Sequence, residues 1–282
     1  MKALLVLFLM VGLMAEAQVQ TPQPSPTAIV STIVGLTDVK IEYSRPKAKG
    51  RKIYGDGSEF TVPYGHLWRT GANNGTSVTF GDDVKVGNAS VVKGTYKIFT
   101  IPGANEWIVI LTKDLTLAGN DPEGYKQEND VARVTVKPEK LAAKIETFTI
   151  EISDLSDDSK TANLQLMWDY TSVKVPITVD FDKKVQASID ANTKINPNNL
   201  FSAANYYLDN GKDLKQALEW ATTAAAARPE AYWMMHLKAK IQKSMGDKAN
   251  AMTSATASRT VAEKEKDAAY VKLNDDLIKS LK

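Results

Sequence analysis

The hydrophobic pattern of this chain changes period near residue 183, which divides it into two parts. Before this point apolar and polar residues alternate, the pattern of half-buried β-strands. The alternation is clearest in two apolar series: Ala162, Leu164, Leu166 and Trp168, then Val173, Val175, Ile177 and Val179. Beyond residue 183 apolar residues recur at helical spacing. The sequence therefore predicts a mainly β domain over 27–182, followed by an α-helical unit over 184–282.

The β part consists of short runs separated by Gly, Pro, Asn and Asp, the residues of tight turns. The earlier runs predict strands at 27–34, 38–44, 76–80, 84–86, 95–101, 106–112, 131–136 and 147–152. The two clearest series are expected to be separate strands, with Leu164, Leu166 and Trp168 facing inward opposite Val173, Val175 and Ile177. Nine to eleven such strands indicate an antiparallel β-sandwich or a barrel-like domain.

The helical part shows a repeat. Ala251 and Ala255 follow Ala217 and Ala221 by 34 residues, with Gly or Pro between the helices. Small residues at this period are typical of tetratricopeptide-like repeats, which usually bind proteins. We expect two degenerate repeats, a capping helix over Val261–Lys282, and a protein partner for this surface.

The N-terminus has the pattern of an export signal. Lys2 precedes an apolar run from Ala3 to Ala15, and Ala15-Glu16-Ala17 forms an A-x-A cleavage site. The run is too short to cross the roughly 30 Å hydrocarbon core of a membrane. We expect a signal peptide over 1–17 with cleavage near Ala17, a Pro-rich linker over 18–26, and a mature chain that is periplasmic or secreted and has no membrane span.

The composition of the chain excludes several chemistries and classes of ligand. The sequence has no cysteine, which excludes disulfides and thiolate chemistry, and its net charge of +2 gives no basic surface for nucleic acid. No phosphate-loop, dinucleotide-binding, serine-hydrolase or zinc-protease motif is present, so no cofactor or metal is expected. The acidic residues Asp154, Asp157 and Asp158 are either oxygen ligands for calcium or an acidic turn between strands.

The candidate site lies in residues 45–74, about thirty residues of mostly irregular sequence rich in Arg and aromatic residues. Loops of this length in a compact domain are usually functional or disordered, and the aromatic residues argue against disorder. Of six Arg in the chain, three fall in this stretch. The candidate ligand-binding residues are Arg45, Arg51, Tyr64, His66, Trp68, Arg69 and Asn73, together with Trp107 from a later strand.

Two interpretations of these residues stay open. The Arg residues either form an anion or sugar-acid pocket walled by aromatic rings, or they pair with Glu42, Asp56 or loop carbonyls and fix the loop. Trp68 is expected to be buried, which would direct Arg69 outward beside Arg45. Histidine as a residue type ionises near neutrality, which makes His66 a candidate for a general base. His236 is expected to serve packing.

Several motifs resemble an exported bacterial family, the domain of unknown function catalogued as 2911. They include Tyr43-Ser44-Arg45-Pro46, Lys49-Gly50-Arg51-Lys52-Ile53, Val62-Pro63-Tyr64-Gly65 and Trp68-Arg69-Thr70-Gly71-Ala72-Asn73. The resemblance covers residues 25–179 and implies that helical repeats commonly follow. It implies no reaction, substrate or catalytic residue.

The hypothesis for function is therefore a non-enzymatic exported binding protein. Its loop would take an anionic or carbohydrate small ligand, and its helical repeats would contact a protein. The alternative is a cell-envelope enzyme that acts on a glycan or another anionic small molecule, using His66 with Arg45 or Arg69.

Overall fold

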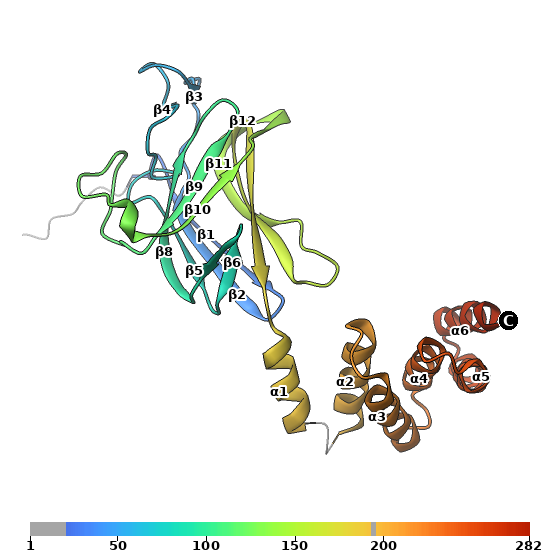
Figure 1. The fold of residues 1–282 in the computed structure, drawn as a ribbon. Coiled ribbons are helices and arrows are strands. Elements are labelled where there is room, and N and C mark those ends of the chain that lie inside the picture. Colours follow the sequence, from blue (N-terminus) through green and yellow to red (C-terminus); the bar gives the residue numbers. More distant parts are fainter. Residues whose placement is uncertain (1–20, 193–195) are drawn as a thin grey trace, which may run out of the picture. The chain divides into compact units, whose positions relative to one another are not determined.

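The computed structural model describes residues 21–192 and 196–282. The expected signal peptide, and residues 18–20 of the expected linker, lie outside the described residues. The chain divides into two compact units between Asp180 and Phe181, the first built of antiparallel β-sheets and the second of six helices (Figure 1). Among the described helices, none has the length and apolar character that a membrane crossing requires.

The larger sheet has six strands in the order β1-β2-β5-β8-β9-β10, all antiparallel. They are β1 (Thr27–Val34), β2 (Thr37–Ser44), β5 (Thr76–Phe80), β8 (Gly94–Ile101), β9 (Trp107–Thr112) and β10 (Asp130–Val136). A two-residue turn joins β1 to β2, and it needs Gly35 at its first position because the φ there is 59°. In β2 the alternation is visible in burial: Val39, Ile41 and Tyr43 are buried between exposed polar residues.

The second sheet has four antiparallel strands in the order β11-β12-β6-β7. They are β6 (Val84–Val86), β7 (Ala89–Val91), β11 (Glu139–Ser153) and β12 (Thr161–Val179). Two short segments, β3 (Tyr54–Gly55) and β4 (Val62–Pro63), form a small parallel pair, and η1 (Gln127–Asn129) precedes β10. The two larger sheets contact each other through buried aromatic side chains, such as Tyr43 of β2 against Phe148 of β11. Neither sheet closes on itself within the described residues.

The expected pair of strands at 162–179 is wrong, because these residues form the single strand β12. The six side chains Leu164, Leu166, Trp168, Val173, Val175 and Ile177 are buried as predicted. Their inward positions change from even to odd numbers between Trp168 and Val173. The change coincides with Asp169, whose φ of 53° interrupts the regular strand geometry. A kink within one strand and a turn between two strands both shift the inward-facing positions from even to odd residue numbers, so the sequence pattern does not distinguish them.

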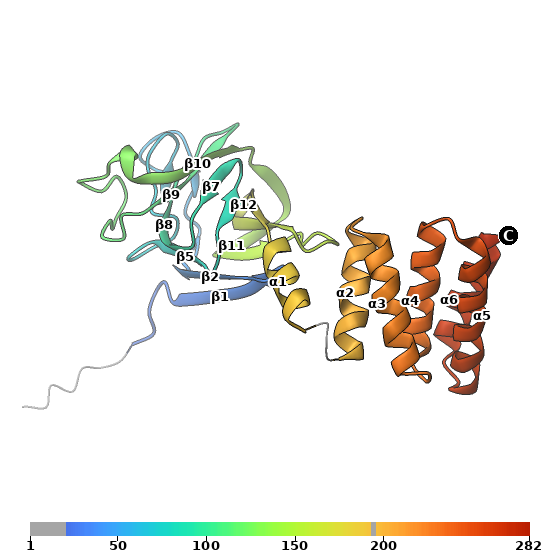
Figure 2. The same ribbon diagram turned by 60° about the horizontal axis from the view of Figure 1, so that its bottom comes forward.

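The helical unit contains α1 (Asp182–Asn192), α2 (Pro197–Asp209), α3 (Leu214–Ala227), α4 (Tyr232–Ser244), α5 (Lys248–Lys264) and α6 (Ala268–Leu281). Figure 2 shows α2 to α6 side by side. The expected start of the last helix at Val261 is wrong. Helix α5 continues to Lys264, and α6 begins after Asp267, whose side chain accepts a hydrogen bond from the backbone N–H of Tyr270.

Alanine forms much of the helical core. One cluster joins Ala204, Ala217 and Ala221 to Leu237 and Ile241. A second cluster joins Ala239, Ala251 and Ala255 to Leu277 and Leu281. A side chain of one carbon at these contacts allows neighbouring helices to approach closely.

Candidate functional site

The loop over residues 45–74, which follows β2, places Trp68 in the interior of the β unit. Trp68 is 3% exposed and pairs with Thr100 of β8 through backbone hydrogen bonds of 2.8 and 2.9 Å. Its ring stacks on that of Trp168 at 6.0 Å and meets the Phe148 ring at 5.2 Å. Trp68 is therefore buried as predicted, and its position between the sheets makes it part of the core.

Two of the arginines are fixed by backbone oxygens. Arg45 donates from Nε to the carbonyl of Phe148 at 3.2 Å and from a terminal nitrogen to Thr149 Oγ1 at 3.1 Å. Arg51 donates to the carbonyls of Ala48 and Lys47 at 3.1 and 2.6 Å. Arg45 thus ties the end of β2 to β11, and Arg51 closes its own turn. These contacts fit the interpretation in which loop and strand carbonyls hold the guanidinium groups.

Arg69 lies differently from Arg45 and Arg51. It is half-buried, and its Nε is enclosed without a hydrogen-bond partner among the described residues. Its backbone N–H donates to Asn120 Oδ1 at 3.3 Å, and its carbonyl accepts from Thr76 N–H at 3.3 Å. No carboxylate in the described part of the chain forms an ion pair with Arg45 or Arg69.

His66 lies at the surface beside an acid. Its Nδ1 is 3.3 Å from Asp121 Oδ2, and both side chains are more than half exposed. The other oxygen of Asp121 accepts from the Leu67 N–H at 2.9 Å, which fixes the carboxylate. The histidine therefore has an orienting carboxylate, but in an open, solvated setting rather than inside an enclosed cavity.

Asn73 belongs to a polar hollow near the start of β1. Its φ is 53°, and its Nδ2 donates to the carbonyl of Ser25 and to Ser44 Oγ at 3.2 and 3.1 Å. The hollow has a volume of about 360 Å³, and Lys97 in its wall donates from Nζ to the carbonyl of Asn74. Burial lowers the pKa of Lys97, an effect that Glu42 partly offsets.

Aromatic rings from the middle of the loop and from other strands line a second cavity. It has a volume of about 270 Å³, and its walls include Tyr64 and Trp107 from the predicted set. Two further rings complete it, from Tyr54 of β3 and Tyr170 of β12. The Tyr54 and Trp107 ring centroids are 4.9 Å apart, with the ring planes at 72°. This cavity is the candidate functional site because it combines aromatic walls with a few polar groups.

The polar groups of this aromatic cavity come from the β11–β12 pair. Glu139 and Lys140 begin β11 and lie opposite Ser172 and Thr171 of β12. Burial raises the pKa of Tyr54 well above its usual value, with smaller contributions in the same direction from Asp169 and Tyr64. The Tyr54 phenol therefore stays neutral and keeps its hydroxyl proton at physiological pH.

Sequence reasoning missed Tyr54 and Tyr170 as site residues. Tyr54 lies in the same long loop as the other candidates, so its proximity in sequence was a usable signal. Tyr170 follows the kink at Asp169 and is 45% exposed. Its place on the cavity wall depends on that kink, which the alternation pattern does not reveal.

The acidic turn after β11 supports the second of the two interpretations considered for it. Asp154 pairs with Lys174 at 2.8 Å, and Asp158 accepts from Ser156 Oγ and the Lys160 N–H. These contacts lower the pKa of both carboxyl groups. No group of three metal-ligating side chains occurs in the part of the chain that the structure describes.

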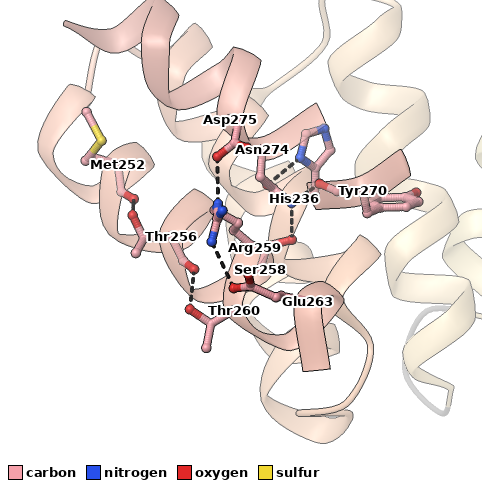
Figure 3. A network of polar contacts seen from close by, with 10 residues as sticks. All are labelled: His236, Met252, Thr256, Ser258, Arg259, Thr260, Glu263, Tyr270, Asn274 and Asp275. Atoms are coloured by element: carbon pink, nitrogen blue, oxygen red, sulfur yellow. Dashed lines mark hydrogen bonds and ion pairs between the residues drawn. The ribbon is translucent and has the colours of Figure 1, made fainter. Parts of the chain in front are cut away.

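A separate polar network connects α4, α5 and α6 (Figure 3). Asn274 donates from Nδ2 to the carbonyl of Tyr270 and to Ser258 Oγ, at 2.8 and 2.9 Å. The Tyr270 carbonyl can only accept a hydrogen bond, so the amide nitrogen of Asn274 must face it. The amide oxygen, Oδ1, then faces His236 and lies 2.8 Å from its Nδ1. His236 Nδ1 therefore carries the proton. The histidine expected to serve packing is also held by one hydrogen bond, to Asn274.

Comparison with known families gives one match. A family model described as a protein of unknown function (DUF2911) matches residues 25–177, more than half of the chain. The match covers most of the β unit and includes the loop and both cavities. No curated protein and no solved structure matches the chain.

Proposed function

This chain belongs to the DUF2911 family, and from that premise we propose that it is an exported binding protein whose aromatic cavity holds a small carbohydrate-like ligand. The observation that carries the proposal is a cavity bordered by three tyrosines, Tyr54, Tyr64 and Tyr170, with the Trp107 ring, 2% exposed, packed against Tyr54. Its volume of about 270 Å³ is below the roughly 300–1,000 Å³ typical of ligand pockets, so only a small ligand would fit.

The chemistry of the walls favours a neutral polar ring over an anion. Ring faces pack against the C–H surface of a sugar, and hydroxyl groups need nearby donors and acceptors. Glu139 and Lys140 supply one acidic and one basic group, so the cavity has no excess positive charge. Of the cations that would attract an anion, Arg45 and Arg51 are occupied by protein oxygens, and Arg69 does not line this cavity.

A binding role is better supported than the enzymatic alternative. The alternative requires His66 to act with Arg45 or Arg69 on a bound substrate. His66 does have a carboxylate partner in Asp121, but neither side chain lines the aromatic cavity. Arg45 contacts β11 rather than an open site.

The finer architecture also belongs to the proposal. Contacts between the six-stranded and four-stranded sheets support a β-sandwich. In the second unit, the capping residues of α3 and α5, Asp213 and Asp247, are 34 residues apart. This spacing supports tetratricopeptide-like repeats, which would offer a surface to a protein partner.

The ligand proposal is tested by titrating the purified protein with neutral monosaccharides and, separately, with uronic acids. Tryptophan fluorescence and calorimetry report binding. We expect neutral sugars to bind and Tyr170→Ala to weaken them roughly tenfold, because an exposed wall of the cavity is lost. Leu155→Ala is the matched control, since Leu155 is similarly exposed, at 51%, and lies outside the cavity. Preferential binding of uronic acids, or equal effects of the two variants, would contradict the proposal.

Export is tested separately by expressing the full sequence in a Gram-negative host and fractionating the cells. We expect the mature protein outside the cytoplasm with Gln18 as its first residue, because the A-x-A site ends at Ala17. An uncleaved cytoplasmic product would contradict export without affecting the ligand proposal.

A further inference from the structure

Strand β1 is an end strand without the usual protection against pairing with another chain. Four strands end the two larger sheets: β1, β10, β11 and β7. β10 and β11 carry charged side chains, and β7 has only three residues. β1 has eight residues, no charge, no proline and a continuous register with β2. Long, regular, uncharged edges are the ones that pair with further strands.

The direction of the β1 backbone groups follows from one hydrogen bond. The Arg45 N–H donates to the Pro26 carbonyl at 2.9 Å, in continuation of the β1–β2 register. Hydrogen-bonded pairs recur at every second residue of an antiparallel ladder. The residues at 28, 30 and 32 therefore bond to β2. Ile29, Ser31 and Ile33 direct their N–H and C=O groups to the other side, where no described strand pairs with them.

The same three residues present an exposed surface. Ile29 and Ile33 are 58% and 61% exposed, and Ser31 between them is exposed as well. Each isoleucine lies two residues from Ser31, one before it and one after it, so the pattern of side chains is symmetric about Ser31. An antiparallel copy centred on Ser31 would place each Ile29 opposite an Ile33.

We propose that two copies of this chain pair through β1, antiparallel and with the two-fold axis at Ser31. This register joins the outward N–H and C=O groups of both strands in about six backbone hydrogen bonds. It also brings four isoleucine side chains together on one face, and no charged side chain of β1 opposes it. The result is a sheet that continues from one protomer into the other. This inference is independent of the aromatic cavity and of its ligand.

The contact is small, so the dimer should be weak and dependent on concentration. A second copy fits β1 better than an unrelated peptide, because the exposed Ile-Ser-Ile pattern of β1 is symmetric about Ser31 and therefore complementary to itself in an antiparallel pair. The register of the two strands is limited by which residues direct their N–H and C=O groups outward, and in β1 these are the odd-numbered ones. Only odd-numbered residues can form hydrogen-bonded pairs with each other, and centring the two strands on Ser31 pairs isoleucine with isoleucine.

The absence of cysteine from the sequence allows a direct test of the register. In a hydrogen-bonded antiparallel pair the opposite Cβ atoms lie about 5.5 Å apart, beyond the roughly 3.5–4.5 Å of a relaxed disulfide. We expect a short homobifunctional maleimide to link Ser31→Cys into a covalent dimer in the purified full-sequence protein. Ile29→Cys should not, because its counterpart in the other strand is residue 33. Val92→Cys, at a 64% exposed site on the same unit, controls for collisions.

Sedimentation equilibrium over a concentration series tests the association without cross-linking. The double variant Ile29→Lys/Ile33→Lys should weaken dimerisation at least roughly tenfold by placing like charges opposite each other. Val92→Lys should leave it unchanged. Circular dichroism and melting confirm that each variant is folded. A wild-type protein that stays monomeric at its solubility limit would overturn the proposal. So would a dimer that Ser31→Cys does not cross-link faster than Val92→Cys.

Discussion

The β unit surrounds five large aromatic side chains, whereas the helical unit packs its helices largely on alanine. The aromatic side chains are Tyr54, Trp68, Trp107, Phe148 and Trp168, whose neighbouring ring centroids are 4.9 to 6.5 Å apart. The buried alanines of the helices lie at positions 203, 204, 217, 221, 224, 239, 251, 255 and 262. The first core depends on filling a large volume, and the second depends on keeping helices close.

This difference predicts opposite sensitivities. Removing atoms should damage the β unit, because a rigid group of rings cannot collapse into the space left behind. Adding atoms should damage the helical unit, because its helices have no spare room at the alanine contacts. Both units also bury hydrogen-bonded polar side chains, such as Gln165 with Ser172 in the β unit and Asn274 with Ser258 in the helical unit.

The largest effect is expected for Trp168→Ala. Trp168 is 1% exposed, stacks on Trp68, and donates from Nε1 to the Glu146 carbonyl at 3.2 Å. Truncation should lower the free energy of unfolding of the β unit by about 3–5 kcal/mol. Denaturant titration followed by tryptophan fluorescence measures it. Tyr170→Ala, two residues away and largely solvated, should change it by no more than about 0.5 kcal/mol. Equal effects would mean that the rings do not form the core.

A smaller loss of stability is expected for Ala221→Leu, which adds atoms to the core instead of removing them. Ala221 is 1% exposed and packs with Ala204, Ala217 and Leu237. The larger side chain should force the helices apart and lower the free energy of unfolding by about 1–3 kcal/mol. Urea titration followed by circular dichroism at 222 nm measures it. Thr222→Leu, at the next and exposed position, is the matched control. A stabilised Ala221→Leu protein would show that the helical core has unfilled space.

Sequence alone located most strands because half-buried strands alternate in polarity. β5 and β6 begin and end at their predicted residues, and β2 differs by one. It missed the first half of β11, because residues 139–146 are mostly exposed and their apolar face is limited to Leu141, Ala143 and Ile145. It divided β12 in two, because a backbone kink at Asp169 and a turn leave the same trace.

The candidate site was less predictable than the fold. Arg45 and Arg51 were identified by residue type, but three of the four hydrogen bonds that they donate go to backbone carbonyls, which carry no sequence signal. The aromatic cavity joins Tyr54 and Tyr64 to side chains more than forty residues away, including Tyr170. Such contacts depend on sheet order, and no local pattern encodes that order.

The smallest predicted effect concerns pH and the polar network of the helical unit. Burial lowers the pKa of His236, and nearby Lys240 adds to this, while the hydrogen bond to Asn274 opposes it. The folded state therefore binds a proton at His236 less readily than the unfolded chain, whose histidine has a pKa of about 6.5. Between the two pKa values the unfolded state holds more protons, so stability rises with pH. The contribution of His236 is complete above about pH 6.5 and decreases as the pH falls toward the lower, folded-state pKa.

We therefore expect the helical transition to melt at a lower temperature at pH 5.5 than at pH 7.5, followed by circular dichroism at 222 nm. Only histidine side chains have an unperturbed pKa in this window, and the chain has two of them. His236→Gln should remove most of the difference. His66→Gln should retain it, because His66 lies on the surface of the β unit. If His66→Gln removes the difference and His236→Gln does not, the buried network does not control the stability of the helices.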